Sequence, residues 1–319
     1  MSGSIATDHL MTFSGRFSEQ LLPEELDHLS VSFLVHDLEV RRGGVAANIC
    51  FGLGVLGLRP VLVGAVGPDF EDYRRWLDTH GVDTAGVRTS ATHHTARFVC
   101  TTDADQNQIA SFYPGAMSEA AEIDLSTLGA LDLVLISPND PAAMVAHSDF
   151  CRRTGLPFAA DPSQQLASLS DEAIRDLLRG TSLLFGNTYE AALLEAKTGW
   201  SAADVLAIVG MRITTHSKDG IAIEQAGAPA LEVGVVPALT VVDPTGVGDA
   251  FRAGFLAGRS WGLSQERSAQ AGALLATLCL ESIGPQEYVV DPPAARARLA
   301  DAYGADAAAE IGDHLARVC

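Results

Sequence analysis

The nine residues from Asp243 to Phe251, DPTGVGDAF, combine two glycines with a carboxylate where a helix is expected to begin. Gly246 and Gly248 allow the backbone to turn tightly and a ligand to approach it closely. The N–H groups of Gly246, Val247 and Gly248 then point from a helix N-terminus, where they can stabilise charge developing on a transferred phosphoryl group. A carboxylate at Asp249 can accept the proton of an attacking hydroxyl. The segment predicts a phosphoryl-transfer site, although a glycine turn before a capped helix shares the shorter GxGD pattern.

Two other segments carry polar groups in patterns that suit ligand binding. Arg42-Gly43-Gly44-Val45-Ala46-Ala47-Asn48 precedes a helical pattern and the apolar run Val61–Val66. It lacks the GxGxxG order of a dinucleotide loop after a first strand, which disfavours a Rossmann-type site. Asn187-Thr188-Tyr189-Glu190 follows an apolar run and opens a helix. A capping box and a site for hydrated Mg²⁺ explain this last pattern equally well.

Short apolar runs alternate with helical patterns along most of the chain. Runs of strand length that are apolar on both faces indicate a parallel sheet covered by helices, so the alternation predicts a doubly wound α/β domain. The runs are Val61–Val66, Leu131–Ile136, Leu156–Ala160 and Ser182–Phe185. The helical patterns between them are Asn48–Leu58, Asp69–His80, Asp171–Arg179 and Tyr189–Thr198. The C-terminal third is expected to be helical over Ala250–Ser260, Glu266–Glu281, Ala294–Tyr303 and Ala305–Val318.

Two stretches in the first third interrupt this alternation. The first stretch, from Thr12 to Arg42, shows no helix of normal length. The second, from His93 to Tyr113, predicts strands at Ala96–Thr102 and Gln108–Phe112 joined by a polar turn. We therefore expect a small β lid. It comprises residues 12–42 and 93–112, and the large catalytic domain comprises residues 1–11, 43–92 and 113–319. A cover for a cleft and an oligomerisation edge both explain the lid, since an exposed sheet edge needs covering.

Composition narrows the classes of partner. The net charge of −19 argues against sequence-independent nucleic-acid binding, which needs Lys and Arg to displace counterions. The five cysteines are far apart, without the CxxC spacing of metal sites, and suit free thiols in a reducing compartment. Neither a signal-peptide pattern nor an apolar run of the ~18 residues that span a membrane is visible. We expect a cytoplasmic protein with no membrane partner.

The nonapeptide, the glycine-pair segment and Asn187–Glu190 together resemble, in order and spacing, the ribokinase-like (PfkB) family of carbohydrate and nucleoside kinases. The resemblance extends from Gly3 to the C-terminus. It implies a ribokinase-like αβα sandwich with a small β-sheet lid and ATP as phosphoryl donor. It also implies Mg²⁺ as a cofactor, held largely through water by the motif that contains Glu190.

The resemblance also assigns the ATP side of the site. Thr215-His216-Ser217-Lys218-Asp219-Gly220 occupies the place of the family's T-x-G-x-x-G loop, with Ser217 in place of the middle glycine. We expect the loop to wrap the phosphates, with charge from Lys218, and a plain hairpin turn is the alternative. The residues expected to contact ATP are Asn187, Thr215, Lys218, Gly220, Gly246 and Gly248. Many relatives bind K⁺ beside the anion hole, and Asp243 and Thr245 match that position.

Longer runs are most similar to the actinobacterial type of adenosine kinase. These runs are Gly3–Met11, Arg16–Pro23, Thr95–Phe98, Ala110–Ala116, Asp161–Leu166 and Asp249–Phe255. By this resemblance Asp8 and Asn48 bind the ribose hydroxyls with help from Ser4 and Gly44, Phe98 and Phe112 sandwich the purine, and Gln164 and Gln165 border the nucleoside. Two rings can stack on a purine, and Gln amides can bond its edge. Packing within the lid is the alternative role for the two rings.

The resulting expectation is an ATP-dependent adenosine kinase that makes AMP in purine salvage, with Asp249 facing the 5′-hydroxyl. A kinase for another nucleoside or for a sugar of the ribose or fructose type is the alternative within the class. A catalytically silent nucleoside- or sugar-binding protein is the alternative outside it. By the same resemblance we expect a homodimer that forms through the lid sheets.

Overall fold

The computed structural model describes residues 1–20 and 31–316 of the 319-residue chain. Leu21-Leu22-Pro23 of the resemblance, the rest of the lid stretch at 24–30, and the end of the last expected helix at 317–318 lie outside the described residues. The central sheet contains β3 (Val61–Val66), β4 (Asp83–Thr89), β7 (Val134–Ile136), β8 (Phe158–Ala160), β9 (Leu183–Asn187), β10 (Arg212–Thr215), β11 (Ile221–Glu224) and β12 (Leu231–Val233). Within the described residues, no helix has the length and apolar character needed to cross a membrane.

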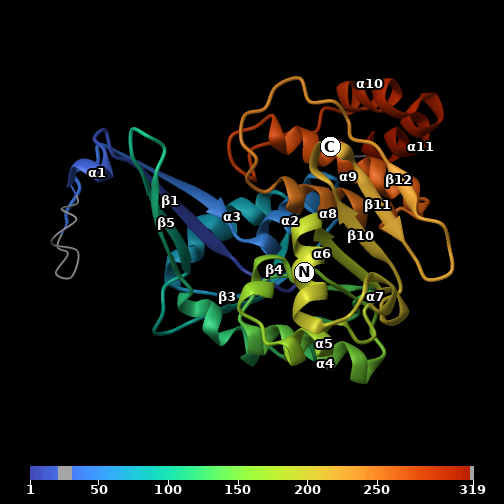
Figure 1. Cartoon of the computed structure of the whole chain (residues 1–319), viewed down its shortest axis with the longest axis horizontal. Helices are drawn as coiled ribbons and strands as arrows, with labels where there is room; N and C mark the ends of the chain where they lie inside the picture. The colour runs from blue at the N-terminus through green and yellow to red at the C-terminus, as the bar shows by residue number, and fades with distance from the viewer. Residues whose placement is uncertain (21–30, 317–319) are drawn as a thin grey trace.

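The helices are α1 (Phe17–Gln20), α2 (Val45–Val55), α3 (Glu71–Thr79), α4 (Pro141–Thr154), α5 (Asp171–Leu178), α6 (Thr188–Thr198), α7 (Ala202–Ile208), α8 (Val247–Ser260), α9 (Gln265–Leu280), α10 (Pro292–Tyr303) and α11 (Ala305–Leu315). The expected helices and strands are therefore present, with boundaries displaced by a few residues. Their arrangement around the sheet is visible in Figure 1.

The order of strands in the sheet explains where the site forms. Six strands run β12-β11-β10-β9-β8-β7, and β3 pairs with β4. Ser2 joins the two groups because it bridges in parallel to both Val63 and Ile136. The strands from β7 to β10 are parallel, whereas β11 and β12 pair antiparallel at one edge. In such sheets ligands bind at the carboxyl ends of the strands, where the chain order reverses.

Neighbouring residues of one strand show how helices cover both faces. Leu183 and Phe185 of β9 belong to the apolar cluster that contains α8 and α9, whereas Leu184 packs with residues of α5 and α6. The rings of Phe185 and Phe255 meet edge to face with centroids 5.5 Å apart. Burial of each such side chain contributes about 1.5–3 kcal/mol. The β9 run is thus apolar on both faces, as a central strand of a doubly wound sandwich must be.

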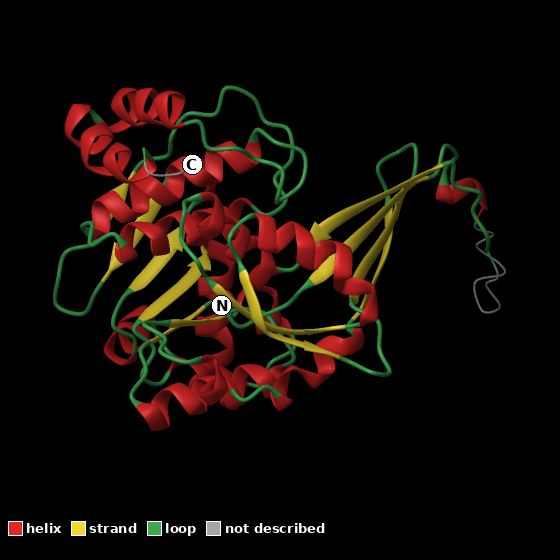
Figure 2. Ribbon diagram, turned by 180° about the vertical axis from the view of Figure 1, so that it is seen from behind, coloured by secondary structure: helices red, strands yellow, loops and turns green. Residues whose placement is uncertain are grey.

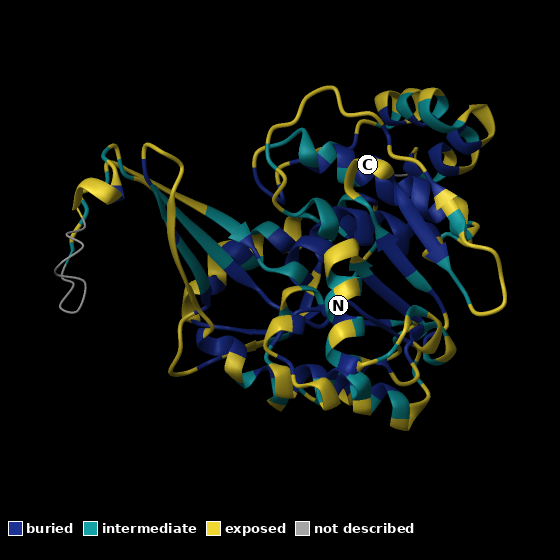
Figure 3. Cartoon of the chain, viewed as in Figure 1, coloured by how far each residue is buried: buried dark blue, intermediate teal, exposed yellow. Residues whose placement is uncertain are grey.

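The lid is a separate sheet that projects from the αβα body (Figures 1 and 2). Its order is β2-β1-β5-β6, with β1 (Ala6–Thr12), β2 (Asp37–Gly43), β5 (Ala96–Thr102) and β6 (Gln108–Tyr113). Residues 6–11 were expected in the large domain but pair within the lid, because β1 continues from the Ser2 bridge without a turn. Strand β6 is exposed along its whole length (Figure 3).

Candidate active site

The turn before α8 presents backbone donors at the expected place. Gly246 has φ of 77° as the N-cap, and a Cβ there would lie 2.3 Å from Cβ of Pro285, so only glycine fits. In the described structure, the N–H groups of Gly246, Gly248 and Asp249 have no protein acceptor. The N–H of Val247 instead lies 3.4 Å from the Pro244 carbonyl oxygen. The free donors at this turn therefore include the N–H of Asp249, whereas the expected N–H of Val247 has a weak intramolecular acceptor.

Asp249 lies in the first turn of α8 and is half-buried. Burial raises the pKa of Asp249 to about 7, against the opposing effects of the Arg252 charge and a hydrogen bond from Asn48. The Nδ2 of Asn48 donates to Oδ2 of Asp249 at 2.8 Å. A carboxylate whose pKa lies near neutral pH is suited to act as a general base.

The orientation of Asn48 is fixed by a residue that sequence reasoning missed. Nε2 of Gln286 donates to Oδ1 of Asn48 at 2.8 Å and also to the hydroxyl of Tyr73. That hydroxyl donates to the Gly43 carbonyl oxygen at 2.9 Å. Because Gln286 holds the amide oxygen, the amide NH₂ of Asn48 must face Asp249. Gln286 stands 238 residues from Asn48, and no local pattern indicates the contact.

The expected ribose-binding residues meet at the start of α2. Gly44 has φ of 97°, and a Cβ there would lie 2.6 Å from the Ser4 carbonyl oxygen. The Ser4 hydroxyl accepts from the N–H of Val45 at 3.0 Å and so caps the helix. The Asp8 side chain extends over Gly43, since a Cβ added at Gly43 would lie 3.0 Å from Oδ2 of Asp8. Burial raises the pKa of Asp8 to about 6, and Arg41 opposes the rise.

The register of the lid places the two expected aromatic residues beside Asp8. Asp8 pairs with Phe98 across β1 and β5, and Phe98 pairs with Phe112 across β5 and β6, so all three share one face. Phe112 is 50% exposed, and the two rings do not stack on each other in the described structure. Cross-strand neighbours lie side by side, so the two rings form one continuous apolar surface in this structure. The rings would have to move apart for a purine to bind between them.

Gln164 and Gln165, expected to border the nucleoside, differ in their exposure and hydrogen bonding. Gln164 is exposed on the 3-10 helix Ser163–Ala167. The amide of Gln165 donates to the Asn139 carbonyl oxygen and accepts from the Ser168 hydroxyl. Gln165 therefore joins this helix to the segment before α4, whereas the exposed Gln164 accepts from the hydroxyl of the neighbouring Ser163 at 2.8 Å.

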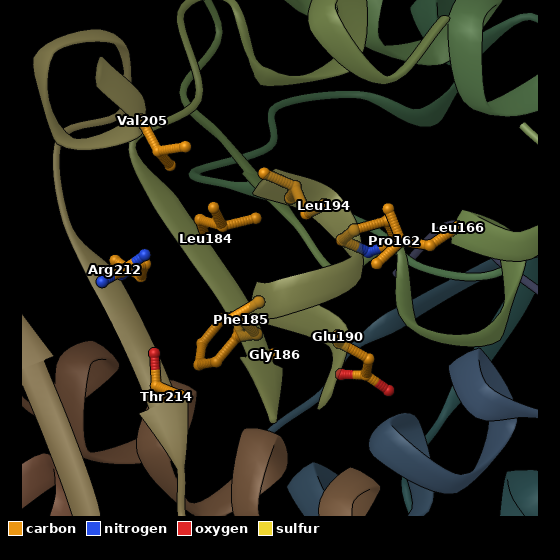
Figure 4. Close-up of a pocket in the computed structure, with 11 residues that line it drawn as sticks. Pro162, Leu166, Leu184, Phe185, Gly186, Glu190, Leu194, Val205, Arg212 and Thr214 are labelled. Carbon is orange, nitrogen blue, oxygen red and sulfur yellow. The ribbon is translucent and has the colours of Figure 1, made fainter. Parts of the chain in front are cut away.

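Asn187 and Glu190 form a capping box at the end of β9. The Asn187 side chain accepts from the N–H of Glu190 at 2.9 Å, and Oε2 of Glu190 accepts from the N–H of Asn187 at 2.8 Å. In Figure 4 the Glu190 carboxylate points away from the apolar residues of the neighbouring pocket. The described residues contain no cluster of three acidic, His or Cys side chains for a metal. Nη2 of Arg252 already lies 4.0 Å from Oε2 of Glu190, so a hydrated Mg²⁺ would meet this carboxylate only through water and would take its other ligands from phosphates.

The expected nucleotide loop is a hairpin connection between β10 and β11. Ser217 has φ of 55°, the left-handed conformation for which the resembling pattern uses glycine. This backbone costs a serine about 1–2 kcal/mol. His216 Nδ1 lies 2.9 Å from the Thr188 hydroxyl, so the loop is tied to the start of α6 near Asn187. Lys218 is exposed, and Gly220 keeps a positive φ of 104°.

Known proteins resemble this chain along most of its length. The family described as pfkB family carbohydrate kinase matches residues 6–291. The chain is 28% identical to the nucleoside kinase of Methanothermobacter thermautotrophicus over 286 residues, an alignment that covers 88% of this chain and 92% of the relative. It is 31% identical over 222 residues to the ATP-dependent ribose-1-phosphate kinase of Halopiger xanaduensis, with 67% and 72% covered. The structure of Burkholderia thailandensis nucleoside kinase in complex with inosine matches with a TM-score of 0.83 at 32% identity, over 95% of this chain and 97% of that one.

The chain belongs to the pfkB family of carbohydrate kinases. This membership confirms the family predicted from the motifs, and the structural match confirms the ribokinase-like α/β fold. The segments that carried the resemblance are also those that meet around Asp249.

In this pfkB chain, the carboxylate that was expected to bind K⁺ already has a cationic partner. Oδ1 of Asp243 accepts from the N–H of Thr245 at 2.9 Å, and its Oδ2 accepts from the N–H of Gly284 at 3.0 Å. The same Oδ2 accepts from Nη1 of Arg41 at 2.8 Å. A K⁺ ion at this carboxylate would lie beside a fixed guanidinium, and like charges 4 Å apart repel by about 4 kcal/mol near a protein surface. The carboxylate of Asp243 is thus already paired with a cation of this chain, which disfavours the K⁺ site that the resemblance implied at Asp243 and Thr245.

Beneath the anion turn of this pfkB chain lies a buried ion pair to which sequence reasoning gave no role. Nη2 of Arg252 contacts Oδ1 of Asp161 at 2.6 Å, and the residues are 7% and 0% exposed. A Cβ at Gly248 would lie 2.8 Å from Nη1 of Arg252. Burial raises the pKa of Asp161 to about 6, and Arg252 opposes the rise. The pair connects α8 to the carboxyl end of β8.

Proposed function

We propose that this chain is an ATP-dependent nucleoside kinase that phosphorylates the 5′-hydroxyl of adenosine to give AMP. The observation that carries the proposal is Asp249, with its pKa of about 7, beside free backbone N–H groups and the amide of Asn48. A base and an anion site held together are what phosphoryl transfer to a hydroxyl requires. The relative from Methanothermobacter thermautotrophicus, a nucleoside kinase, and the Burkholderia thailandensis complex with inosine support a nucleoside as acceptor.

In the proposed reaction the ribose lies against Asp8, Asn48 and Gly44, and closure of the lid excludes water. Asp249 takes the proton of the 5′-hydroxyl as its oxygen attacks the γ-phosphorus of ATP in line, and ADP leaves. The free N–H groups of the turn stabilise the charge on the transferred group. Bound Mg²⁺ would neutralise charge on the phosphate oxygens, and Glu190 with Asn187 would hold it through water.

The lid favours a nucleoside over a simple sugar. Phe98 and Phe112 face the same side as Asp8, so a base attached to a ribose held at Asp8 would reach an aromatic surface. A small polyol has no use for that surface. The ribose-1-phosphate kinase among the relatives keeps a sugar or sugar phosphate as the alternative acceptor. The intact base at Asp249 argues against a silent binding protein.

A coupled ATP-consumption assay with adenosine, inosine, guanosine, ribose and fructose tests the proposal. We expect the highest kcat/KM for adenosine. Phe112→Ala should raise the KM for the nucleoside about 10-fold, since stacking contributes about 1–3 kcal/mol per base. Tyr113→Ala, an aromatic control on the opposite face of β6, should leave the KM unchanged. Equal or faster turnover of ribose or fructose would exclude a nucleoside kinase, and turnover of none would favour a binding protein.

We also propose that the outer face of the lid contacts a second copy of the chain. The face opposite Asp8 carries Leu38, Val40 and Ile109, which are 59%, 54% and 48% exposed. Exposed apolar residues gathered on one sheet face indicate a binding surface. Light scattering should give twice the 33.5 kDa chain mass, and Leu38→Glu with Ile109→Glu should give a single chain. A wild-type mass of one chain at micromolar concentration would contradict the dimer.

A further inference from the structure

Arg41 connects the lid to the loop that carries the anion site. It lies on β2, directly opposite Asp8 of β1, and so faces the substrate side of the lid. Its Nε and Nη2 each donate to one carboxylate oxygen of Glu39 at 2.7 Å. Its Nη1 donates to Oδ2 of Asp243 at 2.8 Å. The bidentate contact with Glu39 fixes the guanidinium plane, so the third donor has a defined direction.

Asp243 in turn organises both sides of the anion turn. Its carboxylate accepts from the N–H of Thr245, the residue immediately before Gly246. It also accepts from the N–H of Gly284, the residue before Pro285, which packs against Gly246. The Gly284 backbone also passes close to the stem of Arg41, since a Cβ there would lie 3.5 Å from its Cδ. The charge of Arg41 therefore sits at the carboxylate that positions the donors of the phosphoryl site.

We propose that Arg41 is a built-in cation of the catalytic loop. Its guanidinium balances the charge of Asp243 and holds the turn in place, so that turnover requires no K⁺. Arg41 acts as a positioning residue because it contacts Asp243 and not the reacting atoms. Since Arg41 belongs to lid strand β2, the turn also depends on where that strand lies. The kinetic part of the inference rests on the proposed kinase activity.

The kinetic test compares KCl, NaCl and choline chloride at equal ionic strength, with the nucleoside that the wild type turns over fastest. The wild type should give the same kcat in all three salts. Arg41→Gln should lower kcat at least 10-fold in choline chloride, because a small displacement of reacting groups is costly. The KM for the nucleoside should also rise, because Arg41 opposes the raised pKa of Asp8. KCl should restore part of that kcat, since K⁺ can then approach Asp243.

Arg42→Gln is the matched control. Arg42 is the next residue of β2. Its Nη1 lies 3.4 Å from Oε1 of Glu287, in the segment that contains Gly284 and Pro285, and it does not contact Asp243. Its substitution should leave the salt response unchanged. Wild-type activity that depends on K⁺, a normal kcat of Arg41→Gln in choline chloride, or a loss that KCl does not relieve would each overturn the proposal.

Thermal unfolding supplies a second readout that needs no turnover. The Tm of the wild type should be the same in KCl and choline chloride, whereas the Tm of Arg41→Gln should be higher in KCl, because a ligand of the folded state stabilises it. A wild-type Tm that rises selectively with KCl would overturn the proposal even if no nucleoside is turned over. Failure of the proposed function alone would leave these Tm differences intact.

Discussion

Replacing Asp249 with Asn is expected to lower kcat by about 10²–10⁴-fold, the range that a positioned general base contributes. Asn has nearly the shape of Asp but cannot accept the proton of the attacking hydroxyl. Binding of the nucleoside and ATP should change little, because the N–H groups of the turn remain in place. Initial rates with isothermal titration of the nucleoside separate the two effects. A variant with a near-normal kcat would rule out Asp249 as the base.

The pH profile gives the same prediction a second readout. Since burial raises the pKa of Asp249 to about 7, wild-type kcat/KM should rise with pH through about 7 as the carboxylate deprotonates. The hydrogen bond from Asn48 lowers that pKa, so Asn48→Ala should move the rise to higher pH, together with a higher KM. The residual activity of Asp249→Asn should lack this rise. The same rise in Asp249→Asn would mean that another group titrates.

The parts of the site that the sequence could predict are those in which neighbours along the chain act together. The glycines at 44 and 246 and the Asn187–Glu190 motif are local patterns, and each has the backbone that its pattern requires. Gly248 instead lies within α8. The apolar run Val61–Val66 likewise became β3 without a shift of boundary, as expected of a run of strand length that is buried on both faces.

The parts that could not be predicted depend on distant pairs. Arg41 and Asp243 are 202 residues apart, and Asn48 and Gln286 are 238 apart. An arginine before a glycine pair has no pattern that indicates a carboxylate in the C-terminal half. The expectation of K⁺ at Asp243 rested on the local motif alone, which gave no sign that this carboxylate has a cationic partner in the lid.

The buried pair beneath the turn should dominate the stability of the site. Arg252→Met is expected to lower the free energy of unfolding by about 3–5 kcal/mol, because it leaves the Asp161 carboxylate buried without its counterion. Adding Asp161→Leu should recover much of this loss, since an apolar pair of similar volume carries no desolvation cost. Urea denaturation measures both. Arg179→Met, which breaks an exposed pair with Asp176 at 2.8 Å, is the control and should cost at most about 1 kcal/mol.

The loss in Arg252→Met should depend on pH with a definite sign. Burial already raises the pKa of Asp161 to about 6 in the folded state, and removal of Arg252 raises it further. A group with a raised folded pKa binds more protons when folded, so its contribution to stability is lost as pH rises through that pKa. The deficit of Arg252→Met relative to the wild type should therefore be larger at pH 8 than at pH 5. A deficit independent of pH, or one no larger than that of Arg179→Met, would show that the Asp161 carboxylate is not stabilised by Arg252. The geometry opposes that outcome, because one guanidinium of α8 lies against both Asp161 and the backbone at Gly248.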